Sequence, residues 1–161
     1  MNQSVLVVYF SATGTTKRIA ETTAELLNAD IYDIIPKQPY TDEDLAYYTN
    51  GRADREQNDP SVRPAISGTV KNMDKYDTII LGYPIWHSQA PRIISTFLEN
   101  YDFSDKTIIP FCTSHSSDIG SSDTNLHNLC SESTKWIKGK RFSSTTSQKD
   151  ITNWLNSIDL K

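Results

Sequence analysis

The chain has 161 residues, of which 37% are hydrophobic and 22% are charged, and these values fit one globular domain with a two- or three-layer core. A formal net charge of -4 and scattered lysines and arginines exclude a typical nucleic-acid-binding protein. The chain has two cysteines, Cys112 and Cys130, which do not form a CxxC pair, so a disulfide framework and a zinc ribbon are excluded and we expect free thiols.

The first residues, MNQSVLVVYF, contain no basic leader ahead of a long apolar stretch and no small-residue cleavage pattern. Apolar runs elsewhere in the sequence are too short to span a bilayer. We therefore expect a cytoplasmic protein that forms a single domain over residues 1–161 and has neither a membrane nor a nucleic acid as its partner.

The first part of the chain alternates apolar runs with a helical pattern. Residues 4–10 (SVLVVYF) form a nearly continuous β-branched and aromatic run, which is typical of a strand buried on both faces. Residues 15–28 carry apolar side chains at helical spacing and predict an amphipathic helix. Residues 29–35 (ADIYDII) alternate more and predict a less buried strand beside the first.

Residues 37–68 interrupt this alternation with a long polar segment. The pattern predicts a helical turn or two over residues 42–48 and no clear second helix until about residues 68–73. Two interpretations stay open for this segment: an excursion over the surface, or a lid beside a functional site.

The second part of the chain returns to alternating strands and helices. Residues 77–83 (DTIILGY) and 106–112 (KTIIPFC) predict inner strands, although Pro110 lacks the N–H group that a neighbouring strand would use. The remaining predicted elements are a helix over residues 91–101, a helix after Ser122, a short strand over residues 135–138 and a helix over residues 149–158. This order predicts an α/β fold in which a parallel sheet lies between two layers of helices, a three-layer α/β/α sandwich.

The loop at residues 11–16 (SATGTT) contains four hydroxyl side chains, one glycine and no acid. Hydroxyl groups and the N–H groups at the start of the following helix favour an anion, so this loop is interpreted as a phosphate cradle. The alternative is that one of the hydroxyls simply caps the helix. Other phosphate sites fit less well, because the sequence has no GxxxxGK[ST], no GxGxxG and no arginine in the loop after Cys112.

Two further loops follow inner strands, and in a parallel sheet they lie at the same edge as the first. Residues 83–91 (YPIWHSQAP) hold Trp86 between two prolines, where it is available to stack on a flat heterocycle or to fill the gap between loop and helix. Residues 113–122 (TSHSSDIGSS) are small and rich in hydrogen-bond donors. Together the three loops predict a site for a phosphorylated planar ligand.

The motifs YFSATGTT, RPAI at residues 63–66, LGYPIWHSQAPRIISTFLE and IIPFCTSHSSDIGSS resemble those of flavodoxin-like proteins that bind FMN, in particular the short-chain flavodoxins of bacteria. The resemblance implies a five-stranded parallel sheet of order 2-1-3-4-5. It also implies a set of FMN-binding residues: Ser11, Thr13, Gly14, Thr15 and Thr16 at the phosphate, Pro84, Ile85, Trp86 and His87 along the isoalloxazine, and Thr113, Ser114, His115 and Gly120 at its other edge. We expect no metal site, because the spacing of His87, His115 and Cys112 does not ensure that their side chains converge, and we assign no catalytic side chain.

Three functions remain open for such a protein. The first is a low-potential electron carrier, a monomer or weak dimer that docks a reductase and an acceptor through a mildly acidic surface. The second is an oxidoreductase, an NAD(P)H-dependent quinone or nitro-compound reductase with its substrate under residues 37–68. The third is a scaffold that has lost FMN. His87 and His115 are either solvated loop residues or groups that titrate with the flavin.

Overall fold

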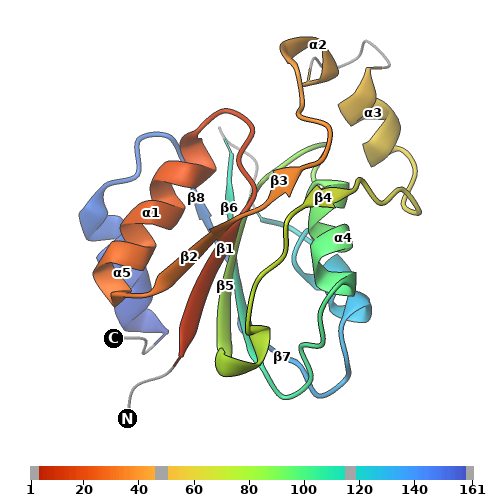
Figure 1. The fold of residues 1–161 in the computed structure, drawn as a ribbon. Helices are drawn as coiled ribbons and strands as arrows, with labels where there is room; N and C mark the ends of the chain where they lie inside the picture. Colours follow the sequence, from red (N-terminus) through yellow and green to blue (C-terminus); the bar gives the residue numbers. More distant parts are fainter. Residues whose placement is uncertain (1–3, 46–50, 115–118, 159–161) are drawn as a thin grey trace.

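The computed structural model describes residues 4–45, 51–114 and 119–158. Within these residues a parallel sheet stands between two layers of helices, which confirms the three-layer α/β fold (Figure 1). The strand order is β2-β1-β5-β6-β7, and β8 also pairs with β6. This is the expected order 2-1-3-4-5, with the numbers raised by two short strands, β3 and β4, that form a separate pair.

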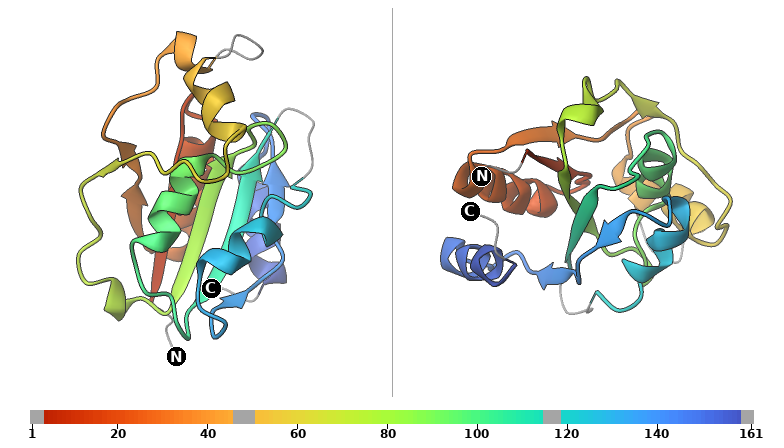
Figure 2. Two further views of the ribbon diagram at one scale, coloured as in Figure 1. Left: turned by 90° about the vertical axis from the view of Figure 1, so that its right-hand side faces the viewer. Right: turned by 90° about the horizontal axis from the view of Figure 1, so that it is seen from below.

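The centre of the sheet consists of β1 (Val5–Tyr9), β5 (Thr78–Pro84) and β6 (Thr107–Thr113). Helices α1 (Thr15–Leu27) and α5 (Gln148–Ser157) cover one face of the sheet, and α4 (Arg92–Glu99) and the 3-10 helix η2 (Thr124–Leu129) cover the other (Figure 2). The helix predicted after Ser122 is thus a 3-10 helix. Since helices cover both faces, the central strands are apolar at successive positions instead of alternating.

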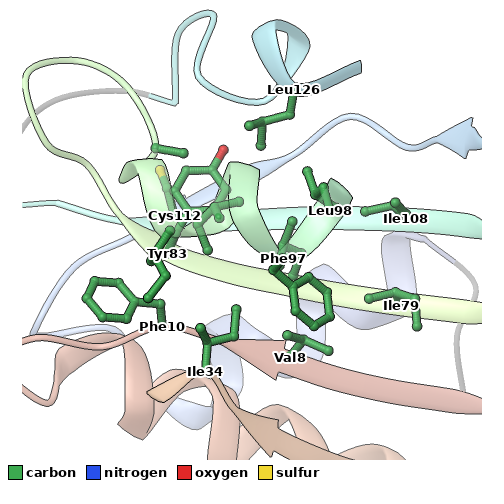
Figure 3. Close-up of a cluster of buried hydrophobic side chains, with 14 of the residues drawn as sticks. Val8, Phe10, Ile34, Ile79, Tyr83, Phe97, Leu98, Ile108, Cys112 and Leu126 are labelled. Atoms are coloured by element: carbon green, nitrogen blue, oxygen red, sulfur yellow. The ribbon is translucent and has the colours of Figure 1, made fainter. Parts of the chain in front are cut away.

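Two hydrophobic clusters fill the spaces between the sheet and the helices. The larger one lies on the α4 side, where Phe10, Tyr83 and Phe97 are 2% exposed or less (Figure 3). The buried hydroxyl group of Tyr83 in this cluster has a polar partner, because it lies 2.9 Å from the hydroxyl group of Ser122. The smaller cluster lies under α1 and α5. Cys112 is buried in the larger cluster, in agreement with an apolar role for this thiol.

The strand at the β6 edge is split into two pieces, of which the sequence predicted only the first. β7 (Lys135–Trp136) pairs with the start of β6 and β8 (Lys140–Phe142) with its end. Pro110 lies between the two paired stretches and has no N–H group to offer a neighbour. A Cβ added at Gly139 would lie 3.0 Å from the carbonyl oxygen of Pro110 and 2.3 Å from the end of the Ile119 side chain, so a larger residue here would force its neighbours to move.

The strand predicted over residues 29–35 also divides. β2 (Asp30–Asp33) pairs with β1, whereas β3 (Ile35–Pro36) turns away and pairs antiparallel with β4 (Ile66–Ser67). The β3–β4 pair joins the two ends of the polar segment.

Between β3 and β4 the polar segment contains α2 (Asp42–Leu45) and α3 (Arg52–Gln57), which stand at the end of the sheet toward which the parallel strands point (Figure 1). The predicted helical turn over residues 42–48 is confirmed as far as Leu45, and the rest of it lies outside the described residues. The expectation of no clear second helix until about residues 68–73 is wrong, because α3 lies before them, and the helix found near that point is the short 3-10 helix η1 (Met73–Lys75). Polar residues line the buried side of α3, and this hides its pattern.

None of the helices in the described parts of the chain is long and apolar enough to cross a membrane.

Candidate functional site

Three loops meet at the carboxyl end of the sheet: the first loop (residues 11–16), the second loop (residues 83–91) and the third loop (residues 113–122, of which 115–118 are not described). Backbone hydrogen bonds fasten each to its neighbour. Phe10 N–H donates to Gly82 O at 3.0 Å, and Ile85 N–H donates to Thr113 O at 3.0 Å. The expectation that these loops share one edge of the sheet is confirmed.

The first loop turns directly from β1 into α1. Gly14 is the N-cap residue with a φ of 100°, no side chain caps the helix, and no acid lies in its first turn. The hydroxyl oxygen of Ser11 accepts a hydrogen bond from Gly14 N–H at 3.0 Å. A Cβ built at Gly14 meets nothing within 4 Å, and Thr13 is exposed beside it, so the space in front of the turn is open. Uncapped N–H groups at a helix start attract an anion.

Thr16 joins the first loop to the third. Its hydroxyl oxygen lies 2.6 Å from that of Thr113, and both residues are buried. Thr15 is half-buried next to it. The hydroxyl of Thr16 therefore has a protein partner, and its expected contact with a phosphate stays a prediction.

The second loop places Trp86 in the core instead of on the surface. Only 7% of Trp86 is exposed, and its ring packs edge-on against Phe10 and Tyr40, with centroids 5.6 Å and 5.2 Å away. These contacts support the packing role of the indole, while stacking on a ligand stays a prediction. Pro84 and Ile85 are half-buried at the start of the same loop.

A tight turn at residues 86–89 forms the tip of the second loop. Trp86 and Gln89 exchange two backbone hydrogen bonds of 2.8 Å and 3.0 Å, and the two residues between them, His87 and Ser88, have φ values of 51° and 67°. The imidazole Nε2 of His87 lies 2.8 Å from Oδ1 of Asp54 on α3. His87 is therefore exposed on one side and contacts the polar segment on the other.

The third loop borders the second through polar side chains. Gln89 Nε2 donates to the hydroxyl of Ser121 at 3.3 Å, and Asn125 Nδ2 donates to Gln89 Oε1 at 2.7 Å. Ser114 is half-buried, and Gly120 is exposed with a φ of 54°. His115, which the sequence also placed here, lies outside the described residues.

Sequence reasoning missed a set of residues in β8 and in the run that follows it. Arg141 Nε donates to the hydroxyl of Ser114 at 3.1 Å, and Arg18 Nη2 donates to Ser144 O at 3.2 Å. Because β8 is parallel to β6, the hydroxyl-rich run SSTTS at residues 143–147 lies at the same end of the sheet as the first loop, and Ser144 contacts α1 through Arg18. A short strand followed by a hydroxyl run is the signal that would have found it.

Asp33 and Tyr9 lie near the site, and their surroundings shift their pKa values. Asp33 ends β2, where burial raises its pKa and a hydrogen bond from Tyr9 opposes that rise. Burial and then the neighbouring Asp33 raise the pKa of Tyr9 to about 12. No group of three or more His, Cys, Asp or Glu side chains that could hold a metal occurs in residues 4–45, 51–114 and 119–158.

This architecture defines a class: open parallel α/β proteins, whose ligand sites lie at the carboxyl ends of their strands. The flavodoxin family's sequence model matches residues 4–158, and the chain belongs to that family. No curated protein matches the chain.

Solved structures resemble the chain over nearly its whole length. A candidate flavoprotein of Bacteroides eggerthii is 43% identical, covers 99% of this chain and 100% of its own, and superposes with a TM-score of 0.92. A second one, from Bacteroides uniformis, is 39% identical over 97% of this chain and 99% of its own, with a TM-score of 0.90. A flavoprotein of Lactobacillus acidophilus, solved in complex with FMN, shares the fold at 18% identity, with 94% and 98% coverage and a TM-score of 0.69.

Proposed function

We propose that this chain binds FMN and acts as a low-potential electron carrier between redox partner proteins. The observation that carries the proposal is the first loop: an uncapped helix start, free of acids, behind a glycine with open space in front of it. The flavodoxin family and the FMN complex of a protein with the same fold support FMN as the ligand.

The first loop fits the phosphate of FMN by the chemistry of its donors. Ser11, Thr13 and Thr15 offer hydroxyl groups, and the first turn of α1 offers backbone N–H groups and the positive end of the helix dipole. A neutral cradle of this kind binds a dianion without repelling it. Lys17 and Arg18, both exposed on the same helix, add positive charge nearby.

The second and third loops would hold the isoalloxazine ring. In this proposal Pro84, Ile85 and His87 lie along one side of the ring, and Thr113, Ser114, His115 and Gly120 border the other. When bound, FMN supplies the electron transfer, and the polypeptide orients the ring and excludes water from it. Trp86 contributes by fixing the second loop to the core.

One observation favours the carrier over an NAD(P)H-dependent reductase. A reductase needs room for a substrate between the polar segment and the flavin, whereas α3 packs directly on the second loop through Asp54 and Gln57. The formal charge of -4 suits docking to basic surfaces of a reductase and an acceptor. We propose that the protein works as a monomer or weak dimer.

Anaerobic titration of the FMN-loaded protein tests this function. A carrier bleaches with dithionite and responds slowly to NADPH alone. Rapid bleaching by NADPH would assign the reductase function instead. A purified protein that stays colourless after addition of FMN would contradict both.

A further inference from the structure

We propose that α3 is the element that positions the turn at residues 86–89 against the flavin, and that Gln57 is its main positioning residue. The inference rests on the proposed function, since it concerns the ring side of the same FMN site. It assigns a role to a polar segment that the sequence left open between a surface excursion and a lid.

The turn at residues 86–89 needs support from outside itself. His87 and Ser88 are both in the left-handed region, which side chains other than glycine adopt at a cost of about 1–2 kcal/mol per residue. Two such residues in succession persist only where surrounding contacts fix them. The turn has no glycine that would lower this cost.

Gln57 supplies that support from the end of α3. Its Nε2 donates to Trp86 O at 2.8 Å and to Ala90 O at 3.2 Å, so one amide group binds backbone carbonyls on both sides of the turn. Gln57 is only 8% exposed. Its own Oε1 is buried without a hydrogen-bond partner, which is unfavourable. Rotating the amide by 180° would be worse, because Oε1 would then face the carbonyl oxygens of Trp86 and Ala90. The amide is therefore oriented to donate its two hydrogen bonds to the turn, although its oxygen is left without a partner.

Asp54, one helical turn before Gln57, holds the tip of the same turn. Its Oδ1 lies 2.8 Å from Nε2 of His87, and only 6% of the Asp54 side chain is exposed. Gln57 thus binds the backbone at the base of the turn, at Trp86 and Ala90. Asp54 contacts His87 at its tip, and both side chains lie on one face of α3.

α3 is in turn fixed from behind. With six residues it is too short to be stable alone. Arg92 of α4 donates to Glu56 O at 3.1 Å and to Gln57 O at 2.7 Å, which satisfies carbonyls at the end of α3. The Glu56 carboxylate accepts from Tyr40 at 2.5 Å and from Arg52 at 2.9 Å. Tyr40 also packs on Trp86, so it links the Glu56 carboxylate of α3 to the second loop.

The test compares ring-side and phosphate-side binding in Gln57 variants. Gln57→Met keeps the length of the side chain and removes both donated bonds, and Gln57→Glu keeps the shape but directs oxygens at the carbonyls of Trp86 and Ala90. Gln38→Met, an exposed position on the same segment, is the matched control. Dissociation constants for FMN and for riboflavin are measured by flavin fluorescence on the apoproteins, and the midpoint potential of bound FMN is measured in each.

We expect Gln57→Met to weaken FMN and riboflavin equally, by about tenfold or ~1.4 kcal/mol. Gln57→Glu should weaken both ligands further. The midpoint potential should shift in both variants, because the ring environment changes, and should stay at the wild-type value in Gln38→Met. A residue that merely stabilised the fold would lower the melting temperature and leave the potential of the bound flavin unchanged.

The outcomes separate this inference from the proposed function. If wild-type protein binds neither flavin, the proposed function fails. If wild type binds FMN and both Gln57 variants retain its affinity and potential, the inference alone is overturned. Should Gln57→Met fail to fold, Asp54→Asn provides the same readouts, and an unchanged potential in that variant would count against α3 as the positioning element.

Discussion

The first and second loops lie at the same end of the sheet, yet they are stabilised in different ways. The first loop is stabilised by contacts close in sequence: Ser11 accepts from Gly14 N–H, and Arg18 N–H donates to Gly14 O. The second loop is held by Gln57 and Asp54, which come from a segment inserted between β2 and β5. Apart from the Thr16–Thr113 contact, the first loop is held by its own residues, whereas the second loop also depends on a helix that is distant in sequence.

Because the two loops are stabilised differently, sequence changes can alter one side of the site without the other. A cradle built from local backbone needs little from the rest of the fold, so phosphate binding can persist while other segments change. A ring-side turn fixed by α3 changes whenever α3 changes. We therefore expect changes in the polar segment to alter the midpoint potential of the bound flavin. Changes in the first loop should alter the part of the affinity that comes from the phosphate.

The largest effect is expected where the second loop enters the core. Trp86→Ala removes an indole packed against Phe10 and Tyr40 and should lower the free energy of unfolding by about 3–5 kcal/mol. Urea unfolding of the apoprotein measures it, with Trp86→Phe as the milder control. A loss below about 1 kcal/mol would show that the loop does not depend on this contact.

An acid in the first loop should break the cradle without breaking the fold. Thr15→Glu places a carboxylate in the first turn of α1, where it repels a phosphate but suits the helix dipole. We expect FMN to bind at least about a hundredfold more weakly, or ~2.7 kcal/mol, with riboflavin binding and thermal stability retained. Calorimetric titration measures both ligands, and Thr22→Glu, further along α1, serves as the control. Equal loss of FMN and riboflavin would contradict a phosphate-specific cradle.

A double-mutant cycle sharpens the link between the first and third loops. Thr16→Val or Thr113→Val each leaves the other hydroxyl buried without its 2.6 Å partner and should cost about 1–2 kcal/mol of stability. The double variant should cost less than the sum, with a coupling of about 1 kcal/mol. Chemical denaturation of the four proteins gives the coupling, and strict additivity would show that the two hydroxyls do not interact.

The smallest effect concerns alkaline pH. Burial raises the pKa of Tyr9 to about 12, so the folded chain retains a proton that the unfolded chain loses above its ordinary pKa of 10.0. This contribution to stability is complete below pH 10.0 and declines as the pH rises toward about 12. Denaturant unfolding between about pH 8 and about pH 11 should show a shallower decline in Tyr9→Phe than in wild type. Identical slopes would exclude Tyr9 as a source of the alkaline loss.

The parts of the fold that the sequence predicted share a simple physical cause. β1, β5 and β6 are buried on both faces, so their residues are apolar in unbroken runs, and the first loop is defined by its own residues. The periodicity of α1, α4 and α5 follows from one buried face each. These features depend on nearby residues, and nearby residues are what a sequence displays.

The parts that were missed depend on contacts between distant residues. α3 buries Asp54, Glu56 and Gln57, which on sequence grounds belong to a solvated surface, because their partners lie on the second loop, Tyr40 and Arg52. The break between β7 and β8 lies opposite Pro110 of β6, which has no N–H group, and Gly139 in this break packs against Pro110. Trp86 looked available for stacking because its packing partners are distant in sequence.

The central claim is that the first loop grips the phosphate of FMN while the second loop meets the ring. Amide chemical shifts of the apoprotein, followed during titration with FMN and then with riboflavin, test it most directly. We expect the amide signals of residues 13–16 to shift with FMN and not with riboflavin, and those of residues 85–89 to shift with both ligands. An equal response of residues 13–16 to the two ligands, or none to either, would contradict it.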